Sequence, residues 1–172
     1  EIIVADTGST DKTREIAEKY ADKVVDFEWI KDFSAARNYC ASFASNNWIL
    51  ALDCDEFVNA IDIRILRMLM QKYPRHTGVL RLKNITHDDK GQAGYVNTDL
   101  TRFYNKNYYT FDYAIHEQVC TKDLSKRDDP MDAFLLPMDV IHHGYALDDE
   151  TMKKKQKRNL ELLYQELDTT PD

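Results

Sequence analysis

The sequence predicts an α/β fold with a mostly parallel sheet in its first half and an antiparallel or mixed sheet in its second half. In the first half, short apolar runs end in polar turns, and each turn leads into a stretch with helical spacing of apolar residues. Beyond Pro74, apolar and polar residues instead alternate, which is typical of strands with one buried face. A length of 172 residues fits one domain.

In the first half, β-branched apolar runs predict buried strands, and the spacing of Ile16, Ala17 and Tyr20 illustrates the helical pattern. Ser9, Thr10 and Asp11 are suitable N-caps for the first helix. The predicted strands are 1–5, 23–27 and 48–52, and the predicted helices are 10–20, 35–44 and 61–72. Strands that alternate with helices in this way usually form a parallel sheet with right-handed crossovers, so we expect these strands to be parallel.

The second half is predicted to contain more strands and one helix. Leu80 and Leu82 alternate with Arg81 and Lys83, and a glycine-containing turn at 91–94 precedes the next strand. The predicted strand segments are 78–85, 95–104, 111–121 and 140–145, with a polar loop at 122–132. The chain closes with an amphipathic helix whose apolar face contains Leu160, Leu163, Tyr164 and Leu167.

The composition excludes several classes of function. A net charge of −7 argues against a nucleic-acid partner, because binding to a phosphate backbone needs a basic surface. No apolar run approaches the ~20 residues of a transmembrane helix. Cys40, Cys54 and Cys120 are odd in number and lack zinc-site spacing, which suits a reducing compartment. We therefore expect a cytoplasmic location.

The first apolar run leads into Asp6-Thr7-Gly8-Ser9, a tetrapeptide also found in aspartic proteases. A protease would need further β-structure after this turn and a second Asp-Thr-Gly, whereas a helical pattern follows here and no second copy exists. A Walker A phosphate loop would need two glycines flanking four residues before Lys-Ser/Thr, and only one glycine is present here. A turn between a strand and a helix remains a place where α/β folds bind ligands.

A second acidic turn, Asp53-Cys54-Asp55-Glu56, follows the predicted strand 48–52. Alternate residues of an extended segment point to the same side, so Asp53 and Asp55 would face one hard cation together. The same residues also fit an acidic turn that caps the next helix. On these residues alone both interpretations stay open.

The order of three blocks, EIIVADTGSTDKTREIAEKYADKV, DFSAARN and NWILALDCDE, resembles family 2 glycosyltransferases of the GT-A fold. RFYN, IHEQV, IHHGY and KRNLELL resemble the later blocks of one subgroup, so the resemblance covers nearly the whole chain. It implies a single GT-A, Rossmann-like domain. Within it, 1–73 would bind the nucleotide, 74–146 would form the acceptor and catalytic half, and 147–172 would be a C-terminal helix.

The resemblance implies a set of nucleotide-binding residues. Asp6, with Thr7 and Ser9 of the same turn, would contact the base or ribose. The family often has two adjacent acids at this point and this chain has only Asp6, which leaves the contacted atom open. Arg37 and Asn38 would lie near the nucleotide, with Arg37 suited to pair with the charge of the diphosphate. Taken alone, Arg37 also fits an ion pair on a helix surface.

The resemblance also implies a metal site and a catalytic base. Asp55 would ligate Mn²⁺ or Mg²⁺, Asp53 would hold the ribose or the metal's water shell, and His142 would complete the metal site. Glu117 would take the proton of the acceptor hydroxyl, and His116 would orient that carboxylate or serve as the base itself. Without the resemblance, His116 and Glu117 fit an ordinary polar strand end, and His142 fits a structural histidine.

The sequence thus predicts a metal-dependent, inverting transfer of sugar from a nucleoside diphosphate, expected to be UDP, to a protein, glycan or cell-envelope acceptor. Two alternatives remain: a catalytically inactive nucleotide-sugar-binding or scaffold domain, and a nucleotidyltransferase, for which a glycine-rich basic loop is missing. The chain starts within a strand pattern, so we expect a truncated N-terminus with one more strand and helix upstream. An exposed first strand would favour a homo-oligomer.

Overall fold

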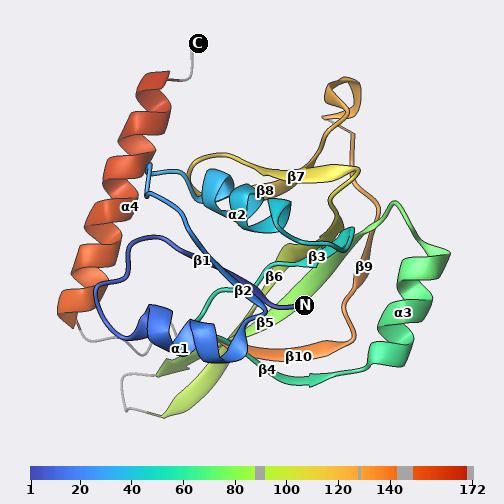
Figure 1. Ribbon diagram of the computed structural model, residues 1–172, viewed down its shortest axis with the longest axis horizontal. Coiled ribbons are helices and arrows are strands. Elements are labelled where there is room, and N and C mark those ends of the chain that lie inside the picture. Colours follow the sequence, from blue (N-terminus) through green and yellow to red (C-terminus); the bar gives the residue numbers. More distant parts are fainter. Residues whose placement is uncertain (88–91, 128, 143–148, 170–172) are drawn as a thin grey trace.

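The computed structural model describes residues 1–87, 92–127, 129–142 and 149–169, which form an α/β fold (Figure 1). The strands are β1 (Ile3–Asp6), β2 (Lys23–Asp26), β3 (Trp48–Leu50), β4 (Glu56–Ile61), β5 (Thr77–His87), β6 (Ala93–Asn105), β7 (Tyr109–Asp112), β8 (Gln118–Thr121), β9 (Ala133–Leu135) and β10 (Met138–His142). The helices are α1 (Thr13–Tyr20), α2 (Phe33–Ser42), α3 (Ile63–Lys72), α4 (Asp149–Thr169) and the 3₁₀ helix η1 (Leu124–Lys126). The predicted α/β class is confirmed.

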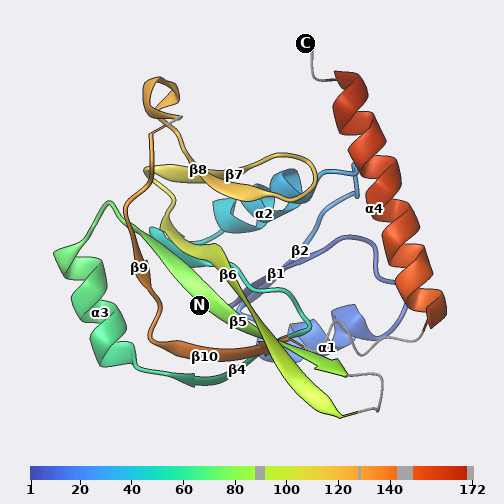
Figure 2. The ribbon, with the colours of Figure 1, turned by 180° about the vertical axis from the view of Figure 1, so that it is seen from behind.

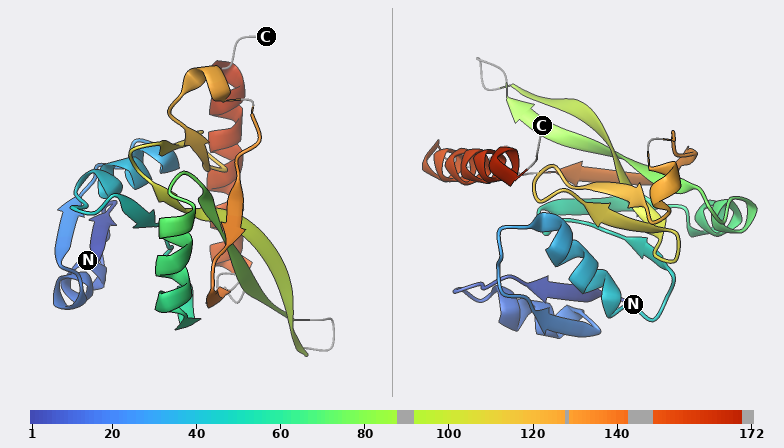
Figure 3. Two further views of the ribbon diagram at one scale, coloured as in Figure 1. Left: turned by 90° about the vertical axis from the view of Figure 1, so that its right-hand side faces the viewer. Right: turned by 90° about the horizontal axis from the view of Figure 1, so that it is seen from above.

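Within these residues the strands form one large mixed sheet and two small sheets. The large sheet has six strands in the order β3-β6-β5-β10-β4, with β9 paired to the start of β5. β9 and β10 run parallel to β5, and the other pairs of this sheet are antiparallel. β1 and β2 form a parallel pair, which lies with α1 in a layer of its own (Figure 3). β7 and β8 form an antiparallel pair.

The prediction of a mostly parallel sheet was wrong in its strand pairing. Only β1 and β2 of the first half are parallel neighbours, and β3 pairs antiparallel with β6, with Trp48 opposite Asn105. A short apolar run indicates a buried strand but carries no information about its neighbour. β4 was not predicted, because it is an edge strand whose residues 57–60 are exposed and show no apolar alternation. The mixed second half is confirmed.

The main core lies where the large sheet meets α3. It contains Leu66 of α3 and buried side chains of the central strands, and Trp48 stacks on Phe103 with ring centroids 4.8 Å apart. Gly78 lies at a tightly packed point of β5: a Cβ there would come within 2.8 Å of Leu136 and Phe103 side-chain atoms. A second cluster, made of Tyr104, Tyr109, Phe111 and Val119, packs the β7–β8 pair against the large sheet.

Aspartates set the starts of two helices. Asp32 accepts a hydrogen bond from the Ala35 amide and begins α2 at Phe33, and Asp62 caps α3 in the same way at Ile63. Both helices therefore begin two residues away from the predicted starts. α1 begins at Thr13. The preceding Lys12 makes no side-chain hydrogen bond to the helix, but Asp11, one of the predicted caps, accepts a hydrogen bond from the Thr13 amide at 2.9 Å.

α4 and α3 lie on opposite sides of the molecule, as Figures 1 and 2 show from the two faces. The predicted inner face of α4 was wrong: Leu160 and Tyr164 are more than half exposed, whereas Leu162 is buried. The Leu167 side chain lies outside the described residues. No helix in the described ranges has the length and apolar character needed to span a lipid bilayer.

Candidate active site

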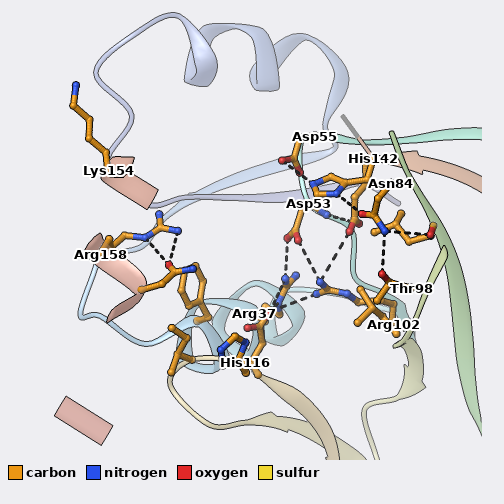
Figure 4. A pocket seen from close by; sticks show the side chains of 17 residues that line it. Arg37, Asp53, Asp55, Asn84, Thr98, Arg102, His116, His142, Lys154 and Arg158 are labelled. Atoms are coloured by element: carbon orange, nitrogen blue, oxygen red, sulfur yellow. Dashed lines mark hydrogen bonds and ion pairs between the residues drawn. The ribbon is translucent and has the colours of Figure 1, made fainter. Parts of the chain in front are cut away.

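The turn after β3 separates its two aspartates. The Asp53 amide donates to Glu56 Oε2 at 2.9 Å, and the Glu56 amide donates back to the Asp53 carbonyl at 3.0 Å. This tight turn ends the extended conformation, so the alternation expected for a strand no longer applies. Asp53 contacts two arginines, whereas Asp55 contacts His142 (Figure 4). The predicted pair of carboxylates is thus split between two environments.

Two arginines from different elements converge on Asp53. Arg37 of α2 donates from Nη2 to Asp53 Oδ1 at 2.8 Å, and Arg102 of β6 donates from Nη2 to Asp53 Oδ2 at 3.3 Å. Both arginines also contact Glu117, the last residue of the loop between β7 and β8. The Arg37, Arg102 and Glu117 side chains are 15%, 11% and 12% exposed, so solvent screens the ion pairs with Glu117 only weakly, whereas the Asp53 side chain is 43% exposed.

The electrostatics of this network favour its charged forms. Burial raises the pKa of Asp53, but Arg37 and Arg102 lower it more, so the net pKa lies below the ordinary value. Burial lowers the pKa of Arg37, and Asp53 and Glu117 outweigh that effect and raise it. Glu56 differs, because burial raises its pKa, and its nearest contact with Arg102 is 4.0 Å long. Burial thus disfavours the charged form of Glu56.

Glu117 uses its two oxygens differently. Oε1 accepts hydrogen bonds from Arg37 Nε at 2.8 Å and from Arg102 Nη1 at 3.5 Å. Oε2 accepts no hydrogen bond from a described residue. Because no buried side-chain oxygen or nitrogen of the described residues lacks a partner, Oε2 is exposed to solvent. The arginines therefore fix the position of the carboxylate and leave one oxygen facing the cavity. His116 beside it is exposed and has a φ of 55°, in the left-handed region where non-glycine residues are uncommon.

His142 at the end of β10 links Asp55 to a buried asparagine. Asn84 Nδ2 donates to the Val96 carbonyl and to Thr98 Oγ1, both at 3.0 Å, so its Oδ1 is the acceptor that faces His142 Nδ1 at 2.8 Å. Nδ1 consequently carries a proton, and the other ring nitrogen, Nε2, faces Asp55 Oδ2 at 3.1 Å. His143, Gly144 and Tyr145 of the same sequence block lie outside the described residues.

In a neutral His142 this arrangement would place two lone pairs against each other. Nε2 of the Nδ1–H tautomer is an acceptor, and a carboxylate oxygen is also an acceptor. The contact is favourable when a proton or a cation lies between the two atoms. The donor set, one carboxylate oxygen and one imidazole nitrogen, is therefore suited to hold a cation.

These groups open into one cavity of about 750 Å³. Its walls are formed by the acidic turn after β3, by the β5–β6 strands, by the loop before β8 and by α4 (Figure 4). The residues lining it are Phe33, Arg37, Asp53, Asp55, Glu56, Leu82, Asn84, Thr98, Leu100, Arg102, Ile115, His116, Glu117, His142, Lys154, Arg158 and Asn159. The structure thus brings together six predicted site residues: Arg37, Asp53, Asp55, His116, Glu117 and His142.

The remaining predicted residues do not line this cavity. Asp6 Oδ1 accepts hydrogen bonds from the amides of Gly8 and Ser9, so the first turn closes on itself with Thr7 inside it. The backbone hydrogen bond from Ser9 lowers the pKa of Asp6. The side-chain amide of Asn38 bonds to β7: it donates to the Phe111 carbonyl and accepts from the Phe111 amide. These contacts hold α2 against β7.

Several residues of the site escaped prediction. Arg102 lies in the RFYN block, but no role was assigned to it, and none was assigned to Lys154, Arg158 and Asn159 of the C-terminal helix. Asn84 carried the clearest signal, because it shares the inward-facing parity of Leu80 and Leu82 along β5 and is 5% exposed. A polar side chain at an apolar position of a strand indicates a specific hydrogen-bond partner.

Comparison with known proteins shows which family has a sequence like that of this chain. The model for "Glycosyl transferase family 2" matches residues 1–127, which include the acidic turn, both arginines and Glu117. The chain belongs to glycosyl transferase family 2. The resemblance stated from the sequence is therefore confirmed, and with it the assignment to the family's GT-A fold.

Curated relatives extend the match over the rest of the chain. A TPR repeat-containing protein of Synechococcus elongatus is 33% identical over 98% of this chain and 41% of its own length. The glycosyltransferase SunS of Bacillus subtilis, derived from the SPbeta prophage, is 27% identical over the whole chain and 40% of its own length. This family 2 chain thus spans about two fifths of the length of these relatives.

Among solved structures, TarS 1-349 of S. aureus in complex with UDP is similar in part. The match has a TM-score of 0.44 and 23% identity, and it covers 50% of this chain and 27% of the other. HddC of Yersinia pseudotuberculosis matches 90% of this chain and 77% of its own, with a TM-score of 0.45 and 10% identity.

Proposed function

We propose that the chain is the transferase domain of a metal-dependent glycosyltransferase that moves a sugar from a nucleoside diphosphate, expected to be UDP, to an acceptor with inversion. Family membership supports sugar transfer in general. The observation that carries the proposal is the shared cavity, in which the Asp55–His142 pair and the solvent-facing Glu117 oxygen lie with two buried arginines. The Asp55–His142 side of this cavity suits a cation and a phosphate bound to that cation, and the Glu117 side suits proton transfer.

The fit of Mn²⁺ or Mg²⁺ rests on Asp55 and His142. No group of three or more His, Cys, Asp or Glu side chains suited to a metal is present in the described residues. A two-ligand site is typical of cations that take their remaining ligands from substrate phosphates and water. A bound cation would stabilise the charge that develops on the leaving diphosphate. Asp53 engages both oxygens with arginines, so we propose that it anchors Arg37 and Arg102 and is not a ligand.

Glu117 is the proposed general base. In the transfer, the acceptor oxygen forms a bond to the anomeric carbon while the bond from that carbon to the diphosphate oxygen breaks, and the acceptor's proton passes to Glu117 Oε2. Attack from the face opposite the leaving group inverts the anomeric centre. The two arginines hold Oε1, so the carboxylate needs little reorganisation. His116 would contact the acceptor or orient Glu117, and the roles of Asp6, Thr7, Ser9 and Asn38 toward the nucleotide stay predictions.

Calorimetric titration with UDP tests the proposal. We expect binding in Mn²⁺, loss of most binding in EDTA, and a comparable loss in Asp55→Asn with Mn²⁺ present. Asp99→Asn is a matched control, because the Asp99 and Asp55 side chains are equally exposed, at 46% and 45%, and Asp99 pairs with Arg81 away from the cavity.

The outcomes separate the alternatives. Metal-dependent UDP binding that Asp55→Asn removes and Asp99→Asn retains would support the donor site. UDP binding that EDTA and Asp55→Asn leave unchanged would refute the metal site. Binding without release of UDP from any UDP-sugar, over a panel of acceptors, would favour an inactive nucleotide-sugar-binding domain.

A further inference from the structure

The cations at the floor of the cavity are already engaged. Arg37 and Arg102 lie between Asp53 and Glu117, and Arg102 also approaches Glu56. With Asp55, the carboxylates of this region outnumber the arginines. A diphosphate that enters would meet a wall whose positive charge is internally neutralised, so its own charge needs another partner.

α4 supplies the opposite wall of the cavity, with Lys154, Arg158 and Asn159. Arg158 has no carboxylate partner among the described residues. Its Nε and Nη2 donate to Asn159 Oδ1 at 3.3 and 3.2 Å, which leaves both Nη1 donors unused within the described part of the chain. Figure 4 shows the Arg158 guanidinium between α4 and the acidic turn, whereas the Lys154 amino group points away from Asp53 and Arg37.

An aromatic ring fixes the guanidinium plane of Arg158. The guanidinium carbon lies 5.3 Å from the centroid of the Phe33 ring, within the range of a cation–π contact. Phe33 is the first residue of α2, and Trp29 packs edge-on against it at 4.8 Å. A guanidinium that contacts a ring in this way keeps its N–H edge available, and that edge matches phosphate oxygens.

We propose that Arg158 binds the diphosphate of the nucleotide-sugar donor, so that α4 forms the phosphate-binding wall of the active site. The inference rests on the proposed function, because it names the residue that receives the leaving group at the same site. As the glycosidic bond breaks, negative charge accumulates on the diphosphate, and Arg158 offsets it from the side opposite to Asp55 and His142. Phe33 and Asn159 act as positioning residues.

Calorimetry with UDP and with uridine, both in Mn²⁺, tests this role. Arg158→Gln should weaken UDP binding about tenfold and leave uridine binding unchanged, because only UDP carries the phosphates. Arg158→Lys should give an intermediate loss, since it keeps the charge but not the planar N–H edge. Lys157→Gln is the matched control: it removes the same charge from an exposed neighbour on α4 that does not line the cavity.

Two results would overturn the assignment while leaving the proposed function intact. One is an equal effect of Arg158→Gln and Lys157→Gln on UDP, which would indicate general electrostatics of α4. The other is an equal loss of UDP and uridine in Arg158→Gln, which would indicate damage to the pocket. A wild-type protein that binds no UDP in Mn²⁺ would instead refute the proposed function, and this inference with it.

Discussion

Two acidic turns of this chain each follow a short strand: Asp6-Thr7-Gly8-Ser9 after β1 and Asp53-Cys54-Asp55-Glu56 after β3. Asp6 accepts hydrogen bonds from amides two and three residues away, within its own turn. Asp53 and Asp55 bond to side chains 16 to 87 residues away, on α2, β6 and β10. A similar local sequence therefore yields a self-contained turn in one place and a functional site in the other.

The difference comes from what surrounds each turn. Gly8 adopts a φ of 106°, which bends the first turn so that its amides point at Asp6. In the second turn the Asp53 amide donates to the Glu56 side chain, and the carboxylates of Asp53 and Asp55 bond to distant partners. All three carboxylates of the second turn line the cavity, whereas no residue of the first turn does.

The strongest test of this contrast removes one distant partner of the second turn. Arg102→Leu would leave Asp53 and Glu117 with one arginine between them in a site that solvent screens poorly. We expect the free energy of unfolding at pH 7 to fall by about 3 kcal/mol, the cost of breaking a largely buried ion pair. Urea denaturation measures it.

Arg81→Leu is the control for that experiment. Arg81 makes a two-pronged contact with Asp99 at 2.8 and 2.7 Å, but both side chains are about half exposed. The substitution should therefore change stability far less than Arg102→Leu. Similar losses in the two variants would contradict the view that the second turn depends on buried long-range partners.

A second test removes the hydrogen bonds that orient His142. Asn84→Ala would deprive His142 Nδ1 of its acceptor and leave the Val96 carbonyl without the Asn84 donor. We expect the protein to lose about 2 kcal/mol of stability, and the Mn²⁺ concentration needed for UDP binding to rise about tenfold or more. Calorimetry at several Mn²⁺ concentrations measures the second effect.

Asn97→Ala is the matched control, because Asn97 is an exposed asparagine on β6 opposite Lys83 of β5. Stability and metal dependence should both stay near wild type. If Asn84→Ala lowers stability without changing the metal dependence, Asn84 is only a packing residue, and His142 does not rely on it for orientation.

The contrast between the two turns also shows how far the sequence could lead. The family and the α/β class were predictable, because the blocks around Asp6, Arg37 and Asp53 stand in a recognisable order. The closure of the first turn was not predicted, although its cause, a glycine two residues after an aspartate, is local.

The long-range partners were harder to predict. Arg102 meets Asp53 because β6 pairs with β3, and it meets Glu117 because the β7–β8 pair packs against β6. Neither contact follows from a local pattern. The mixed order of the large sheet was missed for the same reason. Lys154 and Arg158 were missed because the run of basic residues at 153–158 does not show which of its members faces a cavity.

The smallest expected effect concerns acid stability. Folding lowers the pKa of Asp6 through the Ser9 amide and, despite burial, lowers that of Asp53 through Arg37 and Arg102. A carboxyl with a lowered folded pKa adds stability above its unfolded pKa of about 4, and that stability is lost as the pH falls through the folded pKa. Both residues should therefore contribute to acid unfolding.

The two turns should nevertheless differ when each aspartate is replaced by asparagine. Asp6→Asn keeps an oxygen for the Gly8 and Ser9 amides, so it should shift the acid unfolding midpoint only slightly. Asp53→Asn removes a charge that pairs with two arginines, so the free energy of unfolding at pH 7 should fall. Between pH 5 and pH 2 the free energy of unfolding should then depend less on pH than it does in Asp6→Asn. Circular dichroism along a pH titration distinguishes the two. An equal flattening in both variants would mean that Asp53 is held, like Asp6, by its own turn and not by the arginines.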